Sequence, residues 1–283
     1  MTQEPEHRLP ATDITSALAA TWRPGAAWLV PGWATVCGFI AAKSFAPNEA
    51  VVALISLFIT VGLWPALWSA LAETDWSKMQ ARWRAWDTGE PLKPLPYAVP
   101  DSDAAQLAVV LGKFRAFLVT DLLPTNGVTV ATIVLAPAIA LTLSAVVGTS
   151  AILLTIVAIC IPQLAVLFSR GKGQPSPILQ ALLVIALPIL MGYSLTHTIN
   201  LALLAVAVGC AIAVAGASTW RTWTWNAGLM VVFVLLVVTR HPVGAFGVGL
   251  MWLPQFIAQA QPQNGHVVRW LYLCMLLATY TVG

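Results

Sequence analysis

The segment of residues 73–87 holds the densest group of side chains that could bind a charged ligand. Lys78 and Arg82 are four residues apart, so on a helix they would share one face and form an anion-binding patch. Asp75 precedes them and Arg84 follows them. A second interpretation stays open, in which these residues form a solvated basic loop that contacts anionic lipid headgroups. The interleaved acidic residues would then neutralise part of its charge.

Histidine supplies the other candidate ligands. A neutral imidazole can bind a metal ion through either ring nitrogen. His197 and His241 each fall at the end of a long apolar segment. The alternative interpretation is that both side chains make ordinary hydrogen bonds at helix ends.

Carboxylates are confined to the first part of the chain. All 11 Asp and Glu residues lie at or before Asp121, and residues 122–283 contain none. Metal sites built from carboxylates, such as those for Mg²⁺, as well as carboxylate general bases and carboxylate proton relays, need Asp or Glu side chains. The second part of the chain therefore cannot supply any of these mechanisms.

The 283-residue chain that must position these side chains is 59% hydrophobic and only 9% charged. Soluble domains carry about 25% charged residues, so the composition indicates an integral membrane protein. A membrane span needs about 20 mostly apolar residues, and we predict nine such helices. Seven are clear, at residues 26–45, 50–71, 128–147, 151–168, 178–195, 199–216 and 223–239, and two are weaker, at residues 243–260 and 267–282.

Residues 104–123 form a further apolar stretch, but it carries Lys113 and Arg115. Basic residues concentrate on the cytoplasmic side of membrane proteins. If this stretch lies along the membrane interface, all 14 basic residues except Lys43 and Arg240 fall on the cytoplasmic side. If it crosses, the two sides hold 7 and 5 basic residues and two charges lie within the membrane, at a high cost. We therefore expect an all-α, polytopic bundle of about nine transmembrane helices with a cytoplasmic N-terminus.

The domain organisation follows from these spans. Residues 1–25 are expected to form a cytoplasmic tail, and residues 26–283 a single transmembrane domain. The longest segment outside the membrane, at about residues 72–127, is on the cytoplasmic side and is long enough to be a functional cap. The basic residues flank apolar spans and form no patch of the kind that binds nucleic acid.

Three stretches, taken in order, resemble the UbiA superfamily of intramembrane prenyltransferases, and within it the chlorophyll and bacteriochlorophyll synthases. Residues 21–38 begin with Thr-Trp-Arg-Pro and end with Cys-Gly, which is similar to the opening of the synthases. Residues 90–96, Glu-Pro-Leu-Lys-Pro-Leu-Pro, resemble the Glu-Pro-x-Arg-Pro-x-Pro run after the family's first aspartate motif. Residues 167–177 resemble the Tyr-Ser-x-Pro-Pro segment, with downstream basic residues, that ends its fourth helix.

The resemblance implies a nine-helix fold that transfers an isoprenoid from its diphosphate to an acceptor. In the family, two aspartate-rich motifs hold the Mg²⁺ ions that bind the diphosphate. Under either alignment of the first motif at least two of its aspartates are missing here, and one alignment puts Lys78 and Arg82 in their place. The place of the second motif, near residues 218–226, has no carboxylate. Asp75, Lys78, Arg82 and Arg84 are therefore expected to be a vestigial diphosphate-binding region, with no catalytic and no metal-binding residue.

These observations predict a non-catalytic, bacteriochlorophyll-synthase-like subunit of a larger membrane complex, in the cytoplasmic or a photosynthetic membrane. Its expected partners are membrane lipids and other membrane protein subunits. Its expected ligands are lipid, quinone or (bacterio)chlorophyll, the pigment being held by His197 or His241. The alternative is an active UbiA-type prenyltransferase acting on a chlorophyllide or an aromatic acceptor. A transporter or channel is disfavoured because the spans carry almost no ionisable residues.

Overall fold

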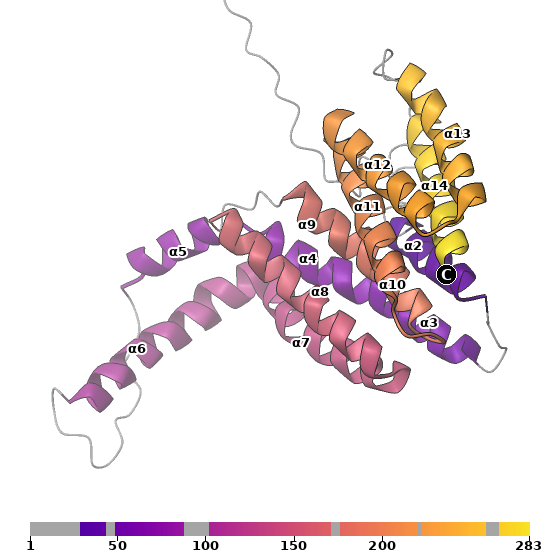
Figure 1. Cartoon of the computed structure of the whole chain (residues 1–283). Coiled ribbons are helices and arrows are strands. Elements are labelled where there is room, and N and C mark those ends of the chain that lie inside the picture. Colours follow the sequence, from indigo (N-terminus) through magenta and orange to yellow (C-terminus); the bar gives the residue numbers. More distant parts are fainter. Residues whose placement is uncertain (1–28, 44–48, 88–101, 171–175, 220–221, 259–265) are drawn as a thin grey trace, which may run out of the picture.

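The computed structural model describes residues 29–43, 49–87, 102–170, 176–219, 222–258 and 266–283 (Figure 1). Throughout these residues the secondary structure is helical, without strands. The α-helices and the π-helical turns (η) are, in order, α2 (Leu29–Ala42), α3 (Ala50–Phe58), η2 (Ile59–Leu63), α4 (Trp64–Ala72), α5 (Trp76–Ala85), α6 (Asp103–Phe117), η3 (Leu118–Leu122), α7 (Leu123–Val147), α8 (Thr149–Phe168), α9 (Pro177–Ala181), η4 (Leu182–Ala186), α10 (Leu187–Tyr193), α11 (Leu201–Ser218), α12 (Thr222–Val238), α13 (Pro242–Ala258) and α14 (His266–Val282).

The predicted all-α architecture is confirmed for the described part of the chain. Among its helices, four are long and apolar enough to cross a membrane, namely Ala50–Ala72, Asp103–Val147, Thr149–Phe168 and Leu201–Ser218. Shorter apolar helices accompany them at Leu29–Ala42, Pro177–Tyr193, Trp223–Val238, Pro242–Leu253 and Trp270–Val282. The length and composition of these helices are those of a membrane protein.

Within the described residues, each of the three π-helical turns is followed by a proline two residues after its end. Pro65, Pro124 and Pro188 stand at the second position of the α-helix that follows η2, η3 and η4, respectively. Proline has no N–H and its ring collides with the carbonyl four residues earlier. A locally wider turn, closed by a bond to the carbonyl five residues earlier, accommodates it. The backbone N–H of Trp64, for example, donates to the Ile59 carbonyl.

Hydroxyl groups join the helices inside the bundle. The Thr35 and Thr60 hydroxyls are 2.8 Å apart and connect α2 with η2. The Ser144 and Thr155 hydroxyls are 2.6 Å apart and connect α7 with α8. All four side chains are fully buried. Lipid tails are as apolar as the side chains of the helices, so the hydrophobic effect does not favour association of helices in a membrane. Interhelical hydrogen bonds of this kind help to hold the helices together.

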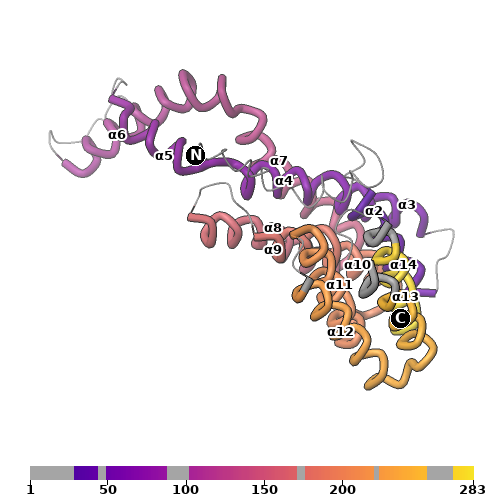
Figure 2. Tube along the Cα trace, turned by 90° about the horizontal axis from the view of Figure 1, so that it is seen from above, coloured from indigo at the N-terminus to yellow at the C-terminus, as the bar shows by residue number. Residues whose placement is uncertain are grey.

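α2 lies next to α10 and α14 (Figure 2). The Trp33 indole N–H in α2 donates to the Tyr272 carbonyl in α14 at 3.3 Å. Gly38 in α2 faces Gly192 in α10, which lets the two backbones approach closely. The first described helix is therefore held by elements from the second half of the chain.

Residues 104–123, predicted to lie along the membrane interface, are helical and run directly into α7. Together α6, η3 and α7 make one helical stretch of 45 residues. At 1.5 Å per residue this stretch is about 70 Å long, roughly twice the thickness of a bilayer's hydrocarbon core. Asn126 departs from helical geometry (φ −132°, ψ 23°) and marks a kink. α6 lies beside α5 and points away from the rest of the bundle (Figure 1). An interfacial helix followed by a span requires such a change of direction.

Candidate functional site

α5 begins at Trp76 because the preceding Asp75 caps it. The Asp75 carboxylate accepts a hydrogen bond from the Lys78 backbone N–H at 3.3 Å and from the Ser77 hydroxyl at 2.5 Å. The Lys78 ammonium lies 3.4 Å from the second carboxylate oxygen. The hydrogen bond from Ser77, assisted by those from Lys78, lowers the pKa of Asp75 below its ordinary value. The carboxylate is therefore held as an anion by its own helix.

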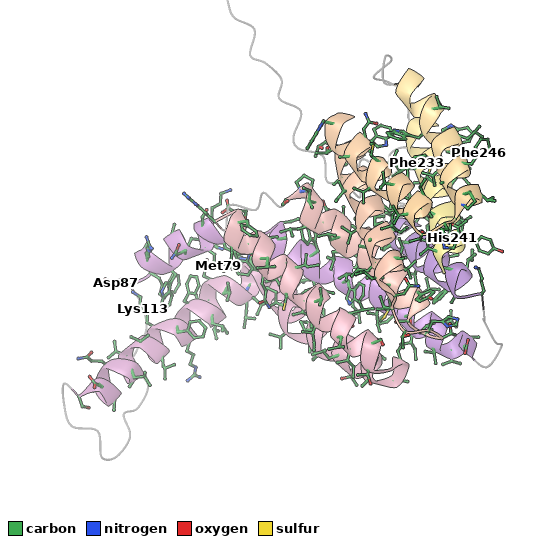
Figure 3. The ribbon with its side chains drawn as sticks, in the orientation of Figure 1. Met79, Asp87, Lys113, Phe233, His241 and Phe246 are labelled. Carbon is green, nitrogen blue, oxygen red and sulfur yellow. The ribbon has the colours of Figure 1, made fainter. Side chains whose placement is uncertain are left out.

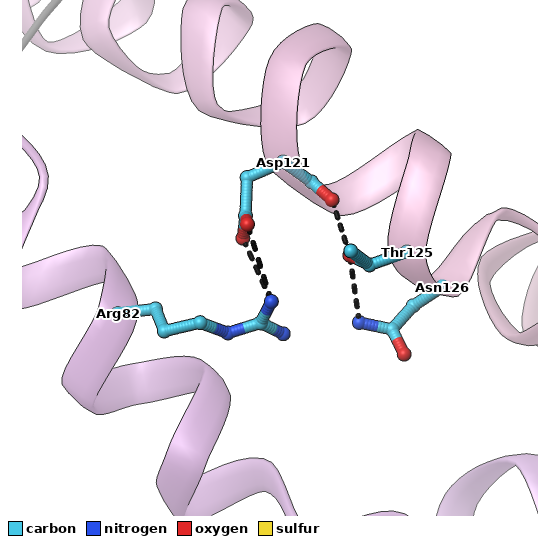
Figure 4. A network of polar contacts seen from close by, with 4 residues as sticks. All are labelled: Arg82, Asp121, Thr125 and Asn126. Carbon is cyan, nitrogen blue, oxygen red and sulfur yellow. Dashed lines mark hydrogen bonds and ion pairs between the residues drawn. The ribbon is translucent and has the colours of Figure 1, made fainter.

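Arg82 joins α5 to the long helical stretch that contains α7. Its Nη1 lies 3.2 Å from one carboxylate oxygen of Asp121, in η3, and 3.1 Å from the other (Figure 4). The Thr125 hydroxyl donates to the Asp121 backbone carbonyl, and the Asn126 amide donates to the Thr125 hydroxyl at 3.3 Å. This network places the Arg82–Asp121 ion pair at the kink in the helical stretch.

Three of the four residues of the predicted diphosphate-binding region meet at one cavity. The cavity has a volume of about 540 Å³ and is lined by Thr74, Asp75, Lys78, Met79, Ala81, Arg82 and Asn126. Arg84 is exposed and does not line it. The spacing of Lys78 and Arg82 thus predicted their common face, whereas Arg84 lies elsewhere on α5.

The charges around this cavity cancel. Lys78 is paired with Asp75, and Arg82 is paired with Asp121. Two formal positive charges therefore face two formal negative charges. A diphosphate carries several negative charges and would have to displace the carboxylates to gain either cation.

The Mg²⁺ ions implied by the resemblance do not fit these residues. A magnesium site needs carboxylate oxygens that are directed at the ion, but the oxygens of Asp75 and Asp121 are engaged by basic groups. Across the described residues, no three His, Cys, Asp or Glu side chains are grouped closely enough to hold a metal ion. No step that requires Mg²⁺ can be derived from this arrangement.

A second cavity lies on the opposite, aromatic face of α5. It has a volume of about 550 Å³, and its lining residues come from α5, α6, η3 and the end of α8: Trp76, Ser77, Met79, Gln80, Trp83, Phe114, Phe117, Leu122 and Arg170. Met79 lines both cavities, and it lies where α5 approaches the bundle (Figure 3).

Ring contacts hold α5 and α6 together beside this second cavity. The Trp83 ring meets Phe114 and Phe117 edge to face, with centroids 6.0 and 5.4 Å apart. Trp86 meets Phe117 in the same way at 5.5 Å. The Lys113 ammonium lies 5.5 Å from the centre of the Trp83 ring, within the range of a cation–π interaction.

His197 is directed at α2. Its Nε2 lies 2.8 Å from the carbonyl oxygen of Ala42, and its ring is tilted against that of Tyr193 at 5.4 Å. A carbonyl oxygen only accepts hydrogen bonds, so Nε2 carries the proton. This hydrogen bond therefore gives the Ala42 carbonyl, at the C-terminal end of α2, a donor.

His241 lies in the turn between α12 and α13, far from α5 (Figure 3). Its backbone N–H donates to the Leu236 carbonyl at 2.8 Å, and its own carbonyl accepts from Ala245 at 3.0 Å. The side chain is half-buried. The structure does not bring His197 and His241 into one site with Lys78 and Arg82.

Several sequence features used above fall outside the described residues. These are residues 1–28, which include the tail and the first part of the synthase-like opening, and residues 90–96, 171–175 and 220–221. The rest of the opening, residues 29–38, lies in α2, and residues 167–170 lie at the end of α8.

The structure adds site residues that were not predicted, namely Asp121, Arg170 and the aromatic face of α5. The signal for that face was present in the sequence. Trp76, Met79, Gln80 and Trp83 follow the i, i+3, i+4, i+7 spacing of one helix face. Asp121 and Arg170 carry no comparable local signal, because only the tertiary fold brings them to α5.

Comparison of the chain with protein-family models, curated proteins and solved structures found no match.

Proposed function

We propose that this chain is a non-catalytic, prenyltransferase-like membrane subunit, and that it serves as an accessory component of a larger membrane complex. In this proposal it crosses the membrane nine times from a cytoplasmic N-terminus, and α5 and α6 belong to a cap on the cytoplasmic side. Its ligand is a lipid, a quinone or a (bacterio)chlorophyll. The photosynthetic membrane is the location that the resemblance to chlorophyll synthases suggests.

One observation carries the proposal: Asp75 and Asp121, the carboxylates that meet the basic side chains of the candidate site, are each in an ion pair. Asp75 pairs with Lys78 and Asp121 pairs with Arg82. The chain has no Asp or Glu after Asp121, where a second metal motif would be needed. Metal-assisted departure of diphosphate needs several free carboxylate oxygens. These residues therefore support a protein that keeps the prenyltransferase-like fold but does not transfer an isoprenoid.

A transfer assay tests the loss of activity. Purified protein is incubated with Mg²⁺, a long-chain isoprenyl diphosphate and either a chlorophyllide or a quinone precursor. We expect no prenylated product above that of a boiled control. A prenylated product that disappears when EDTA is added would overturn the proposal and establish the enzyme.

Co-purification tests the accessory role. Protein extracted from its native membrane in a mild detergent should elute with partner subunits in fixed proportion or with bound pigment, seen in the absorption spectrum. A colourless monomer with no associated protein would contradict this part of the proposal.

A further inference from the structure

We infer that the aromatic cavity between α5, α6 and α8 binds one anionic phospholipid, with an acyl chain among the rings and the phosphate on Arg170. This inference deepens the proposed function by naming the ligand class and its place, and it rests on that proposal only for the membrane location.

The cavity has the size and lining of a binding site for an apolar chain. Its volume of about 550 Å³ falls within the range of about 300–1,000 Å³ that is typical of ligand sites. Trp76, Trp83, Phe114 and Phe117 form much of its wall. An acyl chain would cover these rings and remove their apolar surface from water.

Arg170 gives the cavity its charge preference. Among the described residues that line the cavity, it is the only charged one. In the described part of the chain, its side chain makes no hydrogen bond or ion pair. Lys78 and Arg82, on the other face of α5, both have carboxylate partners. A guanidinium that has no acidic partner among the described residues and lies beside an apolar cavity favours a phosphate attached to an apolar chain.

The surroundings of the cavity favour a membrane lipid over a soluble phosphate ester. α6 exposes apolar side chains along its length, among them Leu107, Val110, Leu111 and Phe114, each more than 40% exposed. α5 buries none of its residues and carries Lys78, Arg82 and Arg84. A polar helix beside an apolar one forms a hairpin suited to the membrane–water interface, where lipids enter laterally.

Arg240 provides a matched control for Arg170. Both residues follow the end of an α-helix, α12 and α8 respectively, and both have a positive φ, 61° and 51°. Arg240 does not line the cavity, and the distribution of basic residues predicts that it lies on the other side of the membrane. Trp223 in α12, which is 79% exposed, is the corresponding control for Trp83.

Native mass spectrometry tests the inference. Full-length protein is released from bilayers of equal parts phosphatidylglycerol and phosphatidylcholine with identical acyl chains, and retained lipid is counted. We expect wild type to retain one phosphatidylglycerol in preference to phosphatidylcholine. Arg170→Gln should lower that retention about fivefold, Arg170→Lys should restore most of it, and Arg240→Gln should leave it unchanged. Trp83→Leu should reduce retention of both lipids, whereas Trp223→Leu should not.

Equal retention of the two lipids by wild type, or equal behaviour of the Arg170→Gln and Arg240→Gln variants, would overturn the phosphate assignment. Unchanged retention in Trp83→Leu would overturn the placement of the chain. These outcomes are distinct from failure of the proposed function, because a prenylated product in the transfer assay would refute that function while leaving the lipid count unaffected.

Discussion

Gly38 of α2 and Gly192 of α10 lie directly against each other. A β-carbon on Gly38 would stand 2.1 Å from the Ile189 carbonyl oxygen and 3.0 Å from the Gly192 α-carbon, and one on Gly192 would stand 2.2 Å from the Thr35 carbonyl oxygen. The helices cross at a distance that only glycine permits, because backbone atoms occupy the space of any side chain.

Gly38→Ala should therefore lower the free energy of unfolding by about 1–3 kcal/mol, as overpacking of a tight core does. Thermal unfolding in detergent, followed by circular dichroism, measures the loss. Gly127→Ala is the control, since nothing lies within 4 Å of the added methyl group. Equal midpoints for the two variants would show that the α2–α10 crossing is looser than described.

The Arg82–Asp121 ion pair should contribute to the attachment of α5. The two side chains are only 40% and 21% exposed, so the surrounding water screens them partly. A double-mutant cycle with Arg82→Gln and Asp121→Asn should give a coupling energy of about 0.5–1 kcal/mol. The cycle of Lys78→Gln with Asp75→Asn is the control and should show no measurable coupling, because the Lys78 side chain is 82% exposed. The reverse order of the two couplings would contradict this assignment.

His197→Phe should destabilise the bundle by about 0.5–1.5 kcal/mol. The phenyl ring can keep the contact with Tyr193, but the hydrogen bond from Nε2 to the Ala42 carbonyl is lost. His241→Phe should cost less, because the hydrogen bonds described for His241 are made by its backbone. Urea titration of both variants compares them, and a larger loss in His241→Phe would refute the role given to His197.

The cap of α5 should depend on pH in a defined direction. The pKa of Asp75 is lowered in the folded chain, first by the hydrogen bond from the Ser77 hydroxyl and then by the one from the Lys78 backbone N–H. The stabilisation of α5 by the ionised Asp75 carboxylate is therefore complete above the ordinary Asp pKa of about 3.9. It is lost as the pH falls through the lowered pKa of the folded chain. The Lys78 amide resonance should report a midpoint below that ordinary pKa, and Asp75→Asn should abolish the transition. A midpoint at or above the ordinary value would argue against the cap.

Much of the fold could be predicted because apolar runs in this sequence have clear ends. Residues 151–168 were predicted as a span and form α8 (Thr149–Phe168), and residues 267–282 form α14 (His266–Val282). The π-helical turns could not be predicted. A proline such as Pro65 signals that the regular hydrogen-bond ladder is interrupted, but the same signal is compatible with a kink, a break or a wider turn.

The candidate site was predictable only where its residues share one helix. Four-residue spacing put Lys78 and Arg82 on a common face, and the structure has them line one cavity. The Arg82–Asp121 pair joins residues 39 apart in sequence, and it depends on the direction in which α6 returns to α5. Arg170 reaches the aromatic cavity through the placement of α8, which no local pattern encodes.

The contacts of α2 have a consequence for biogenesis. Its carbonyl at Ala42 is satisfied by a residue 155 positions later, and its Trp33 by one 239 positions later. Because synthesis proceeds from the N-terminus, α2 leaves the ribosome long before α10 and α14 exist. Until those helices are made, the glycine surface of α2 stays uncovered. Chains that terminate before α14 would lack that helix's contacts with α2 and present an incompletely packed segment to membrane proteases.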